Sequence, residues 1–224
     1  QSLPNWGPVA DAGGRTVAMT NLFTDPASLA SQQATLESLF CPSLMDTWTS
    51  EPGPFLVTTV LHEAAHNLGP ISGHRVDGQS DEQRFGGPIA SMLEELKAQT
   101  AALYFTETLV DAGVLDDVQR QQMHTADIGW ALDQMSDGMY DADGSFHAYA
   151  MLAAIQVGWL MNDEALIWAP EANAANDTDI GCFTVDNTKM RTSIEGMAAE
   201  VLRIEGDMDK PGAEALKTRY VDDE

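Results

Sequence analysis

Apolar and polar positions recur along most of this chain with the spacing of amphipathic helices. Thr24, Asp25 and Pro26 form a helix start signal, and an amphipathic segment follows them. Further helices are predicted over residues 55–68, 88–112, 116–137, 146–162, 187–205 and 210–219. Strand patterns are few: residues 16–20, and a hairpin from 165–168 to 182–185 across the polar turn region 169–181. We therefore predict a mainly α fold with a minor β-strand and hairpin component.

The predicted helix over residues 55–68 reads FLVTTVLHEAAHNL and is apolar apart from one short motif. Its length and the stop signal Gly69-Pro70 favour a helix, although the β-branched run 57–60 also suits a strand. A helix of this composition is expected to be buried. Polar side chains inside it are costly unless a partner satisfies them, and a metal ion would do so.

The motif is His62-Glu63-Ala64-Ala65-His66, which has the pattern HExxH. Two histidines four residues apart lie on one face of an α-helix, so both rings can bind one zinc ion. Glu63 can then act as general base toward a zinc-activated water. The alternative is a chance pair of histidines on an amphipathic helix, and the chemistry carried by the motif favours the zinc site.

A catalytic zinc site needs a third protein ligand. In the extended pattern HExxHxxGxxH, Gly69 is in place, but the ligand position holds Ser72, and His74 comes two residues too late. The other candidates are Glu94 and Glu95 on the next predicted helix. An acidic pair near a helix N-terminus is also favoured by the helix dipole alone. Next to HExxH, we expect one of the two to bind the metal.

With HEAAH followed by EELKAQ at 94–99, the chain resembles the zinc-binding catalytic lobe of the dipeptidyl-peptidase III family of metallopeptidases, as a bacterial family-like member. The resemblance implies that one Zn²⁺ per chain is held by His62, His66 and Glu95, with Glu63 as the catalytic base. Residues 145–166 are similar to the family segment whose histidine helps stabilise the transition state, and this implies a catalytic role for His147. Residues 206–220 resemble the late helical hairpin of the family, and 13–22 its strand and Asn segment.

The sequence departs from the family in three respects. It has HExxH where eukaryotic members have HExxxH, and the shorter form suits an undistorted helix. Gln99 replaces the acidic residue that closes the second motif, so a hydrogen bond to a metal ligand, and metal affinity with it, is expected to differ. The family's long N-terminal region, which forms a second lobe with a catalytic tyrosine, has no counterpart. We therefore expect residues 1–224 to be a single, mainly helical catalytic lobe of a longer two-lobed protein.

Composition and charge narrow the choice of partners. The chain is acidic, with 35 acidic and 11 basic residues and a net charge of −24, which repels nucleic acid and anionic membranes. No apolar stretch is long enough to predict a membrane-spanning helix. The expected partners are a peptide substrate and the N-terminal lobe, with no nucleic acid and no membrane. Cys41 and Cys182 either pair as a disulfide or stay buried thiols. Location is left open, with a periplasmic or secreted one favoured over the cytoplasm.

The sequence thus predicts a zinc-dependent metallopeptidase, a hydrolase that cleaves peptide bonds. Two alternatives stay open: a non-catalytic, zinc-stabilised lobe that binds peptides or another partner, and a zinc hydrolase of another amide or ester. Among the remaining histidines, His124 is expected to pack or to lie on a helix surface, and His74 to face solvent on a loop near the zinc site. The acidic segment 141–144 is expected to be a turn rather than a calcium loop.

Overall fold

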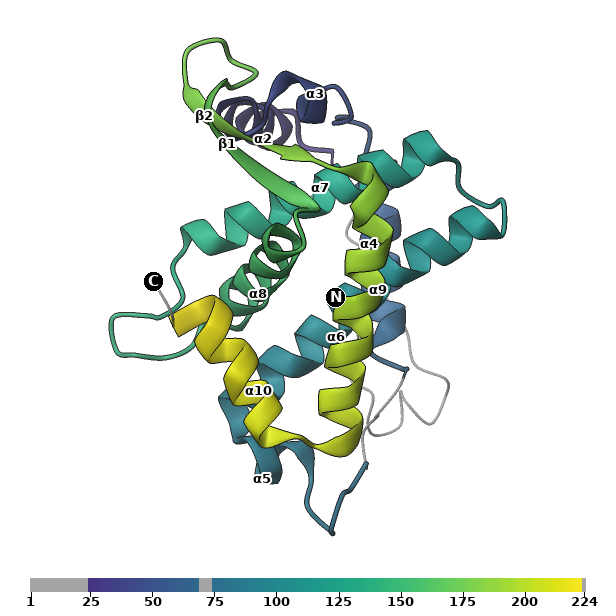
Figure 1. Ribbon diagram of the computed structural model, residues 1–224, viewed down its shortest axis with the longest axis vertical. Helices are drawn as coiled ribbons and strands as arrows, with labels where there is room; N and C mark the ends of the chain where they lie inside the picture. Colours follow the sequence, from purple (N-terminus) through teal and green to yellow (C-terminus); the bar gives the residue numbers. More distant parts are fainter. Residues whose placement is uncertain (1–23, 69–73, 223–224) are drawn as a thin grey trace.

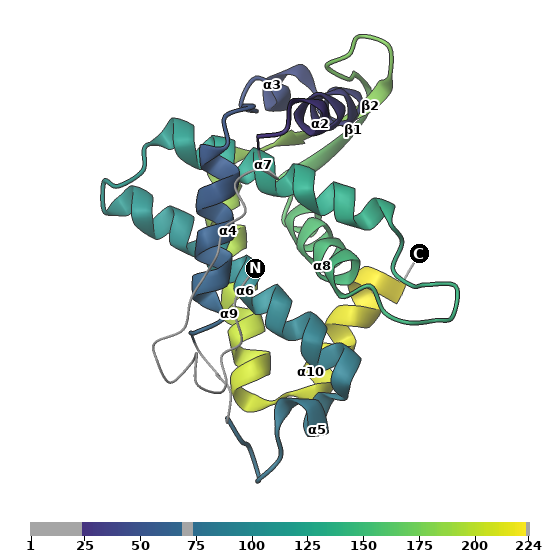
Figure 2. The ribbon, with the colours of Figure 1, turned by 180° about the vertical axis from the view of Figure 1, so that it is seen from behind.

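The computed structural model describes residues 24–68 and 74–222 of the 224. Figures 1 and 2 show a β-hairpin together with helices α2 and α3 at one end of the molecule, and α5 and α10 at the other. Helices α6, α8 and α9 lie between these ends. The strand predicted at 16–20 and the family-like segment 13–22 lie outside the described residues.

The predicted helices are all present, so the mainly α fold with a minor β-hairpin is confirmed. The elements are α2 (Pro26–Leu39), α3 (Pro42–Met45), α4 (Gly53–Ala65), α5 (Asp81–Phe85), α6 (Gly87–Asp111), α7 (Asp117–Ser136), α8 (Ala148–Asn162), β1 (Leu166–Asn173), β2 (Ile180–Val185), α9 (Asn187–Asp207), α10 (Lys210–Lys217) and the π-helix η2 (Thr218–Asp222). The short helices α3 and α5 were not predicted. Helix α5 lies just before α6, and Ser80 and Gln83 form a capping box at its start.

Helix α6 is the centre of the packing, because it contacts α4, α7, α8 and α9. It begins at a glycine followed by Pro88, which suits the first helical turn. Its buried side chains join those of α8 and α9 in one core, whose largest members include Met92, Leu93, Leu96, Leu103, Met151, Leu152 and Ile155. The helix is therefore a rigid support for any side chain that it directs toward its neighbours.

Helix α4 is less buried than its composition predicts. Ala65 is its one fully buried residue, and Val60 is 46% exposed. One face of α4 packs on α6 and α7. Another face, which carries Phe55, Thr58 and Thr59, lines a cavity instead of the core. The prediction of a buried helix was wrong because apolar composition does not reveal whether the neighbour is protein or open space.

The hairpin pairs β1 with β2 in antiparallel register, with Leu166 opposite Val185 and Ala169 opposite Cys182. Strand β1 runs on into the segment predicted as a polar turn. A register shift after Ala169 accommodates Pro170, which cannot donate to the ladder. Cys41 and Cys182 form a disulfide, which ties the start of α3 to β2 and settles the two alternatives that the sequence left open.

Close packing also places α2. A Cβ atom added to Gly129 of α7 would lie 2.9 Å from Cδ2 of Leu36, so the glycine allows α2 to approach α7. The backbone of Cys41 donates to the carbonyl of Phe183, which joins the segment after α2 to the hairpin. Helix α2 thereby forms a wall of the cavity beside α4. Among the described helices, none is long and apolar enough to span a membrane.

Candidate metal centre

The last turns of α4 bring His62 and His66 together. Their ring centroids are 4.9 Å apart and the rings meet edge to face, as the i, i+4 spacing predicts. The helix ends at Ala65, so His66 is its C-terminal cap and keeps a helical backbone conformation. Only 12% of the His62 side chain and 14% of the His66 side chain are exposed. The two rings therefore lie in a partly desolvated position.

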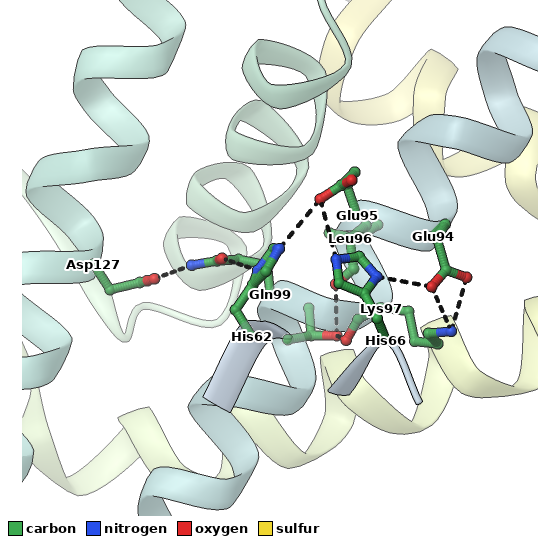
Figure 3. A network of polar contacts seen from close by, with 9 residues as sticks. His62, His66, Glu94, Glu95, Leu96, Lys97, Gln99 and Asp127 are labelled. Carbon is green, nitrogen blue, oxygen red and sulfur yellow. Dashed lines mark hydrogen bonds and ion pairs between the residues drawn. The ribbon is translucent and has the colours of Figure 1, made fainter. Parts of the chain in front are cut away.

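Helix α6 supplies the carboxylate that faces both rings. Oε2 of Glu95 lies 3.2 Å from Nε2 of His62 and 3.7 Å from Nε2 of His66. Figure 3 shows the Glu95 side chain reaching over the two imidazoles from α6. The three residues can each offer one donor atom, with all three atoms within 4.8 Å of one another. The sequence-predicted ligands are thus brought into one cluster.

The other ring nitrogen of each histidine is held by α6 as well. Nδ1 of His62 lies 2.9 Å from Oε1 of Gln99, and Nδ1 of His66 lies 2.9 Å from Oε1 of Glu94. Lys97 donates to both carboxylate oxygens of Glu94, at 2.9 and 2.8 Å. Because the Nδ1 atoms are engaged, the Nε2 atoms are the ones directed at Glu95. Such outer hydrogen bonds orient the ligands of metal sites.

Electrostatics in the cluster favour paired charges. The hydrogen bond to Glu94 raises the pKa of His66, and burial opposes it only in part. Burial raises the pKa of Glu95, but the hydrogen bond from His62 and the charges of both histidines outweigh it, so the pKa lies below its ordinary value. Burial also raises the pKa of Glu94, but the hydrogen bonds from His66 and Lys97 outweigh it, so this pKa too lies below its ordinary value. The carboxylate of Glu95 is thereby kept ionised, which is the form that binds a cation.

The donor set fits zinc. Two imidazole nitrogens and one carboxylate oxygen form the three-ligand set that catalytic zinc sites use, with a further position left for water or substrate. The Nδ1 atoms are satisfied by an amide and a carboxylate, as the ligand histidines of such sites require. His62, His66 and Glu95 would hold the ion, and Glu94 and Gln99 would support it.

A cavity of about 820 Å³ opens beside the cluster. His62, Glu63 and Gln99 line it on the side of the metal ligands, and Trp130 and Tyr149 line it farther along. Its volume is in the range of small-molecule and cofactor pockets. Glu63, the predicted base, therefore borders both the candidate ligands and a space that can receive a substrate.

His147 and Tyr149 lie at the start of α8 and point to different surroundings. His147 caps the helix, and its ring nitrogens contact Asp141, at 2.7 Å, and the carbonyl of Gly138, at 2.8 Å. Tyr149 lines the cavity, and its hydroxyl is close enough to Glu95 to feel its charge. Burial, together with the charges of Glu95 and Glu63, raises the pKa of Tyr149 to about 12. Its hydroxyl is thus a proton-bearing donor at neutral pH, and sequence reasoning missed it.

Behind Gln99 lies a buried carboxyl group that the sequence reading also missed. Nε2 of Gln99 donates to Oδ1 of Asp127 on α7, and Nε2 of Gln156 on α8 donates to Oδ2. Burial raises the pKa of Asp127 to about 7, and the two amide hydrogen bonds oppose that rise. The one sequence signal is an acidic residue inside the otherwise apolar run of α7.

The other histidines lie apart from these contacts. His124 is 2% exposed, and its Nε2 lies 3.2 Å from Oε1 of the equally buried Glu107. This agrees with the expected packed histidine. His74 was expected to face solvent, but it is partly buried and its Nε2 contacts the carbonyl of Gly206 at 3.1 Å. That expectation was wrong because the His74 ring contacts the backbone near the end of α9. The segment 141–144 forms the predicted turn.

The candidate site forms where α4, which carries HExxH, packs against α6, which carries Glu95. Two solved structures share the fold. A dipeptidyl-peptidase III from Caldithrix abyssi matches 98% of this chain and 39% of its own length, with a TM-score of 0.81 and 22% identity. A dipeptidyl-peptidase III from Corallococcus sp. strain EGB matches 84% of this chain and 32% of its own length, with a TM-score of 0.68 and 22% identity. The resemblance inferred from the two motifs is confirmed at the level of the fold.

In sequence, the chain is similar to Nudix hydrolase 3 of Arabidopsis thaliana. The two are 25% identical over 167 residues, which are 74% of this chain and 20% of that protein. No protein-family model matches the chain. The chain therefore spans between a fifth and two fifths of the lengths of these relatives, each of which is named as a peptidase or a hydrolase.

Proposed function

We propose that this chain is the zinc-binding part of a metallopeptidase of the dipeptidyl-peptidase III kind. One observation carries the proposal: Nε2 of His62 and Nε2 of His66, on α4, both face Oε2 of Glu95 on α6, at 3.2 and 3.7 Å. The fold of two dipeptidyl-peptidase III structures, and a sequence relative named as a hydrolase, support a hydrolytic function. When bound, zinc supplies Lewis-acid activation of water and of the scissile carbonyl.

The residues around the cluster suit peptide hydrolysis. Glu63 follows His62 directly and lines the cavity, so its carboxylate can accept a proton from the attacking water. The water oxygen then bonds to the carbonyl carbon. The C–N bond breaks as the proton passes from Glu63 to the leaving amine, which restores the Glu63 carboxylate. Glu63 thus acts first as base and then as acid, and no other proton carrier is required.

The transition state needs a donor for the developing charge on the carbonyl oxygen. The family resemblance proposes His147 for this role. In the structure its ring nitrogens contact Asp141 and Gly138, so His147 would have to give up these contacts to reach a substrate. Tyr149, on the first turn of the same helix, already lines the cavity beside Glu95 with a protonated hydroxyl. We propose Tyr149 as the donor, with His147 as the alternative.

Peptides are the proposed substrates, and a further lobe is the proposed partner. The chain matches 39% of one peptidase structure and 32% of the other, so most of each relative lies outside the match. A substrate cleft that needs groups from that remainder would be incomplete on this chain alone. The net charge of −24 argues against nucleic acid and anionic membranes as partners.

The test of this proposal uses metal analysis and hydrolysis together. The chain, alone and within the longest natural polypeptide that contains it, should bind about one zinc ion per chain. Glu63→Gln should keep the metal and lose peptide hydrolysis, because the amide cannot accept the proton. Asn67→Asp, in the next turn and exposed, is a matched control that should keep both properties. A Glu63→Gln variant with undiminished activity would exclude the proposed base.

The rival function is a zinc-stabilised lobe that binds peptides or another partner without cutting them. The partial match to each relative is the observation that favours it. Zinc binding with no hydrolysis of peptides, amides or esters, by the chain or by the longer polypeptide, would establish the rival. Hydrolysis of an ester or a non-peptide amide, without peptide cleavage, would instead indicate a zinc hydrolase that acts on another amide or ester.

An oxidising compartment is the proposed location. The buried Cys41–Cys182 disulfide supports it, because disulfides of this kind persist mainly in secreted and periplasmic proteins. Thiol labelling of the protein in its own cells tests the proposal. Blocked cysteines would support it, and two free thiols would place the protein in a reducing compartment.

A further inference from the structure

Gln99 stands between His62 and Asp127, and an amide in this place can face either way. Its oxygen accepts and its NH₂ donates, so its orientation decides what it offers to the imidazole. In the structure, Oε1 of Gln99 faces Nδ1 of His62 at 2.9 Å, and Nε2 donates to Asp127. Figure 3 shows the row from Asp127 through Gln99 to His62. The orientation of the amide therefore depends on what Asp127 can accept or donate.

Asp127 fixes the orientation of the Gln99 amide, because an ionised carboxylate accepts hydrogen bonds and donates none. The NH₂ group of Gln99 must therefore face Asp127, and the amide oxygen must face the imidazole. An amide oxygen only accepts, so Nδ1 of His62 has to carry the hydrogen. In the metal-free chain Nε2 pairs with Glu95 at 3.2 Å, so it is the ring nitrogen left to give up its hydrogen and bind a metal. Asp127 thereby selects which ring nitrogen of His62 can bind the metal.

The surroundings of Asp127 reinforce this orientation of the Gln99 amide, with its NH₂ group toward Asp127. Asp127 is 3% exposed, Gln99 5% and Gln156 fully buried, so little water reaches these groups even though Gln99 and Asp127 border the cavity. Gln156 also turns its NH₂ toward Asp127. Its own oxygen is then buried with no hydrogen-bond partner among the described residues. A buried unpaired oxygen is costly, so both amides are oriented by the demand of one carboxylate.

We propose that Asp127 is a positioning residue of the metal centre: through Gln99 it keeps the hydrogen of His62 on Nδ1 and leaves Nε2 free for the metal. The inference rests on the proposed zinc site for its function. The resemblance places an acidic residue at the position of Gln99, in hydrogen-bonding reach of the ligand. In this chain the position is neutral, and the negative charge lies one side chain farther away, on α7.

A set of substitutions separates this role from simple core packing. Asp127→Asn nearly conserves the volume but offers one donor and one acceptor, so Gln99 loses its imposed direction. The double variant Asp127→Asn with Gln99→Glu restores the direction. The amide introduced at position 127 would then donate to the carboxylate introduced at position 99 and accept from Gln156, while that carboxylate accepts from His62. Glu107→Gln, which neutralises another buried carboxyl group, on α6, is the matched control.

The first measurement is the affinity for Zn²⁺, by competition with a chromophoric chelator, at a pH above the pKa of Asp127. Asp127→Asn should weaken binding by roughly tenfold or more, as outer-shell changes at metal sites do. The double variant should bind within a few-fold of the wild type, and Glu107→Gln should bind like the wild type. Unchanged affinity in Asp127→Asn, or no recovery in the double variant, would overturn the inference, since packing alone predicts no recovery.

The second measurement is made on the metal-free chain, so it does not depend on the proposed function. Nitrogen-15 NMR of the imidazoles should show hydrogen on Nδ1 of His62 in the wild type and the double variant. In Asp127→Asn the population with hydrogen on Nδ1 should fall. A His62 ring that is the same in all three proteins would overturn the inference. Absence of zinc binding by the wild type, with the NMR result as expected, would refute the zinc enzyme and leave the orienting role standing.

Discussion

Oε2 of Glu95, on α6, lies 3.2 Å from Nε2 of His62, on α4. The two residues are 33 positions apart in sequence, and the packing of α4 on α6 brings them together. A carboxylate and an imidazole at this distance pair with each other in the absence of a metal. When a cation binds, both can turn the same atoms to it without a change in the packing of the helices.

Zinc should stabilise the folded chain, because the three ligands are assembled only when α4 and α6 are packed. Free zinc at 100 times its dissociation constant should add about 2.7 kcal/mol to the free energy of unfolding. His62→Ala should abolish the gain. Denaturant unfolding with and without zinc measures it, and His124→Ala, although buried elsewhere, should keep the gain. Equal zinc effects in the wild type and in His62→Ala would remove His62 from the site.

Glu205 should make stability depend on pH. Burial raises its pKa from 4.5 to about 8, and nearby Lys97 opposes the rise only in part. Between these two pH values the unfolded chain has lost the proton that the folded chain keeps. The contribution of Glu205 to the free energy of unfolding therefore falls as pH rises through this window. Glu205→Gln should flatten that decline in urea titrations at several pH values. A decline as steep as that of the wild type would show that other groups cause it.

The disulfide between Cys41 and Cys182 should contribute strongly to stability, since the bonded residues are 141 positions apart in sequence. Replacing both cysteines by serine should lower the free energy of unfolding by about 2–5 kcal/mol, because the unfolded chain gains entropy when the cross-link is lost. Denaturant unfolding measures the loss. The wild type under reducing conditions should match the double serine variant. Equal stability of the oxidised and reduced wild type would contradict this account.

Tyr149 and His147 should differ in their effect on turnover. Tyr149→Phe should lower kcat by roughly 10²-fold, the cost of removing one donor to the oxyanion, with zinc content unchanged. His147→Gln should have the smaller effect, because its ring contacts Asp141 and Gly138. Steady-state kinetics with a peptide substrate, on the active form of the protein, compare the two. A larger loss in His147→Gln would return the role to His147 and imply that the turn before α8 rearranges.

Local signals in the sequence were sufficient for the helices. Asp25 accepts from Ser28 at the start of α2, as its position before Pro26 predicts. The spacing of His62 and His66 placed both rings on one face because helix geometry is fixed by hydrogen bonds within the element. The hairpin followed from two short apolar runs. In each case the information lies within a few residues of the element that it determines.

Tertiary contacts were not available from the sequence. Asp127 and Tyr149 reach the centre because α7 and α8 pack beside α4 and α6. The hydrophobic periodicity of α7 and of α8 does not predict that contact. The acidic residue in the apolar run of α7 was a signal of a buried polar partner, but not of its identity. Glu94 and Glu95 were recognised as a pair, and only the packing shows that Glu94 contacts Nδ1 of His66 while Glu95 faces both Nε2 atoms.

Zinc stoichiometry in Glu95→Gln and Glu94→Gln tests the central claim most directly. The wild type should carry about one zinc ion per chain in native mass spectrometry. Glu95→Gln should lose the ion at matched free zinc, because it removes a ligand. Glu94→Gln should retain it with reduced affinity, since Glu94 contacts Nδ1 of His66 and not the Nε2 atom that faces Glu95. Zinc retained equally by the wild type and Glu95→Gln, or no zinc in any of the three proteins, would contradict a metal centre built from His62, His66 and Glu95.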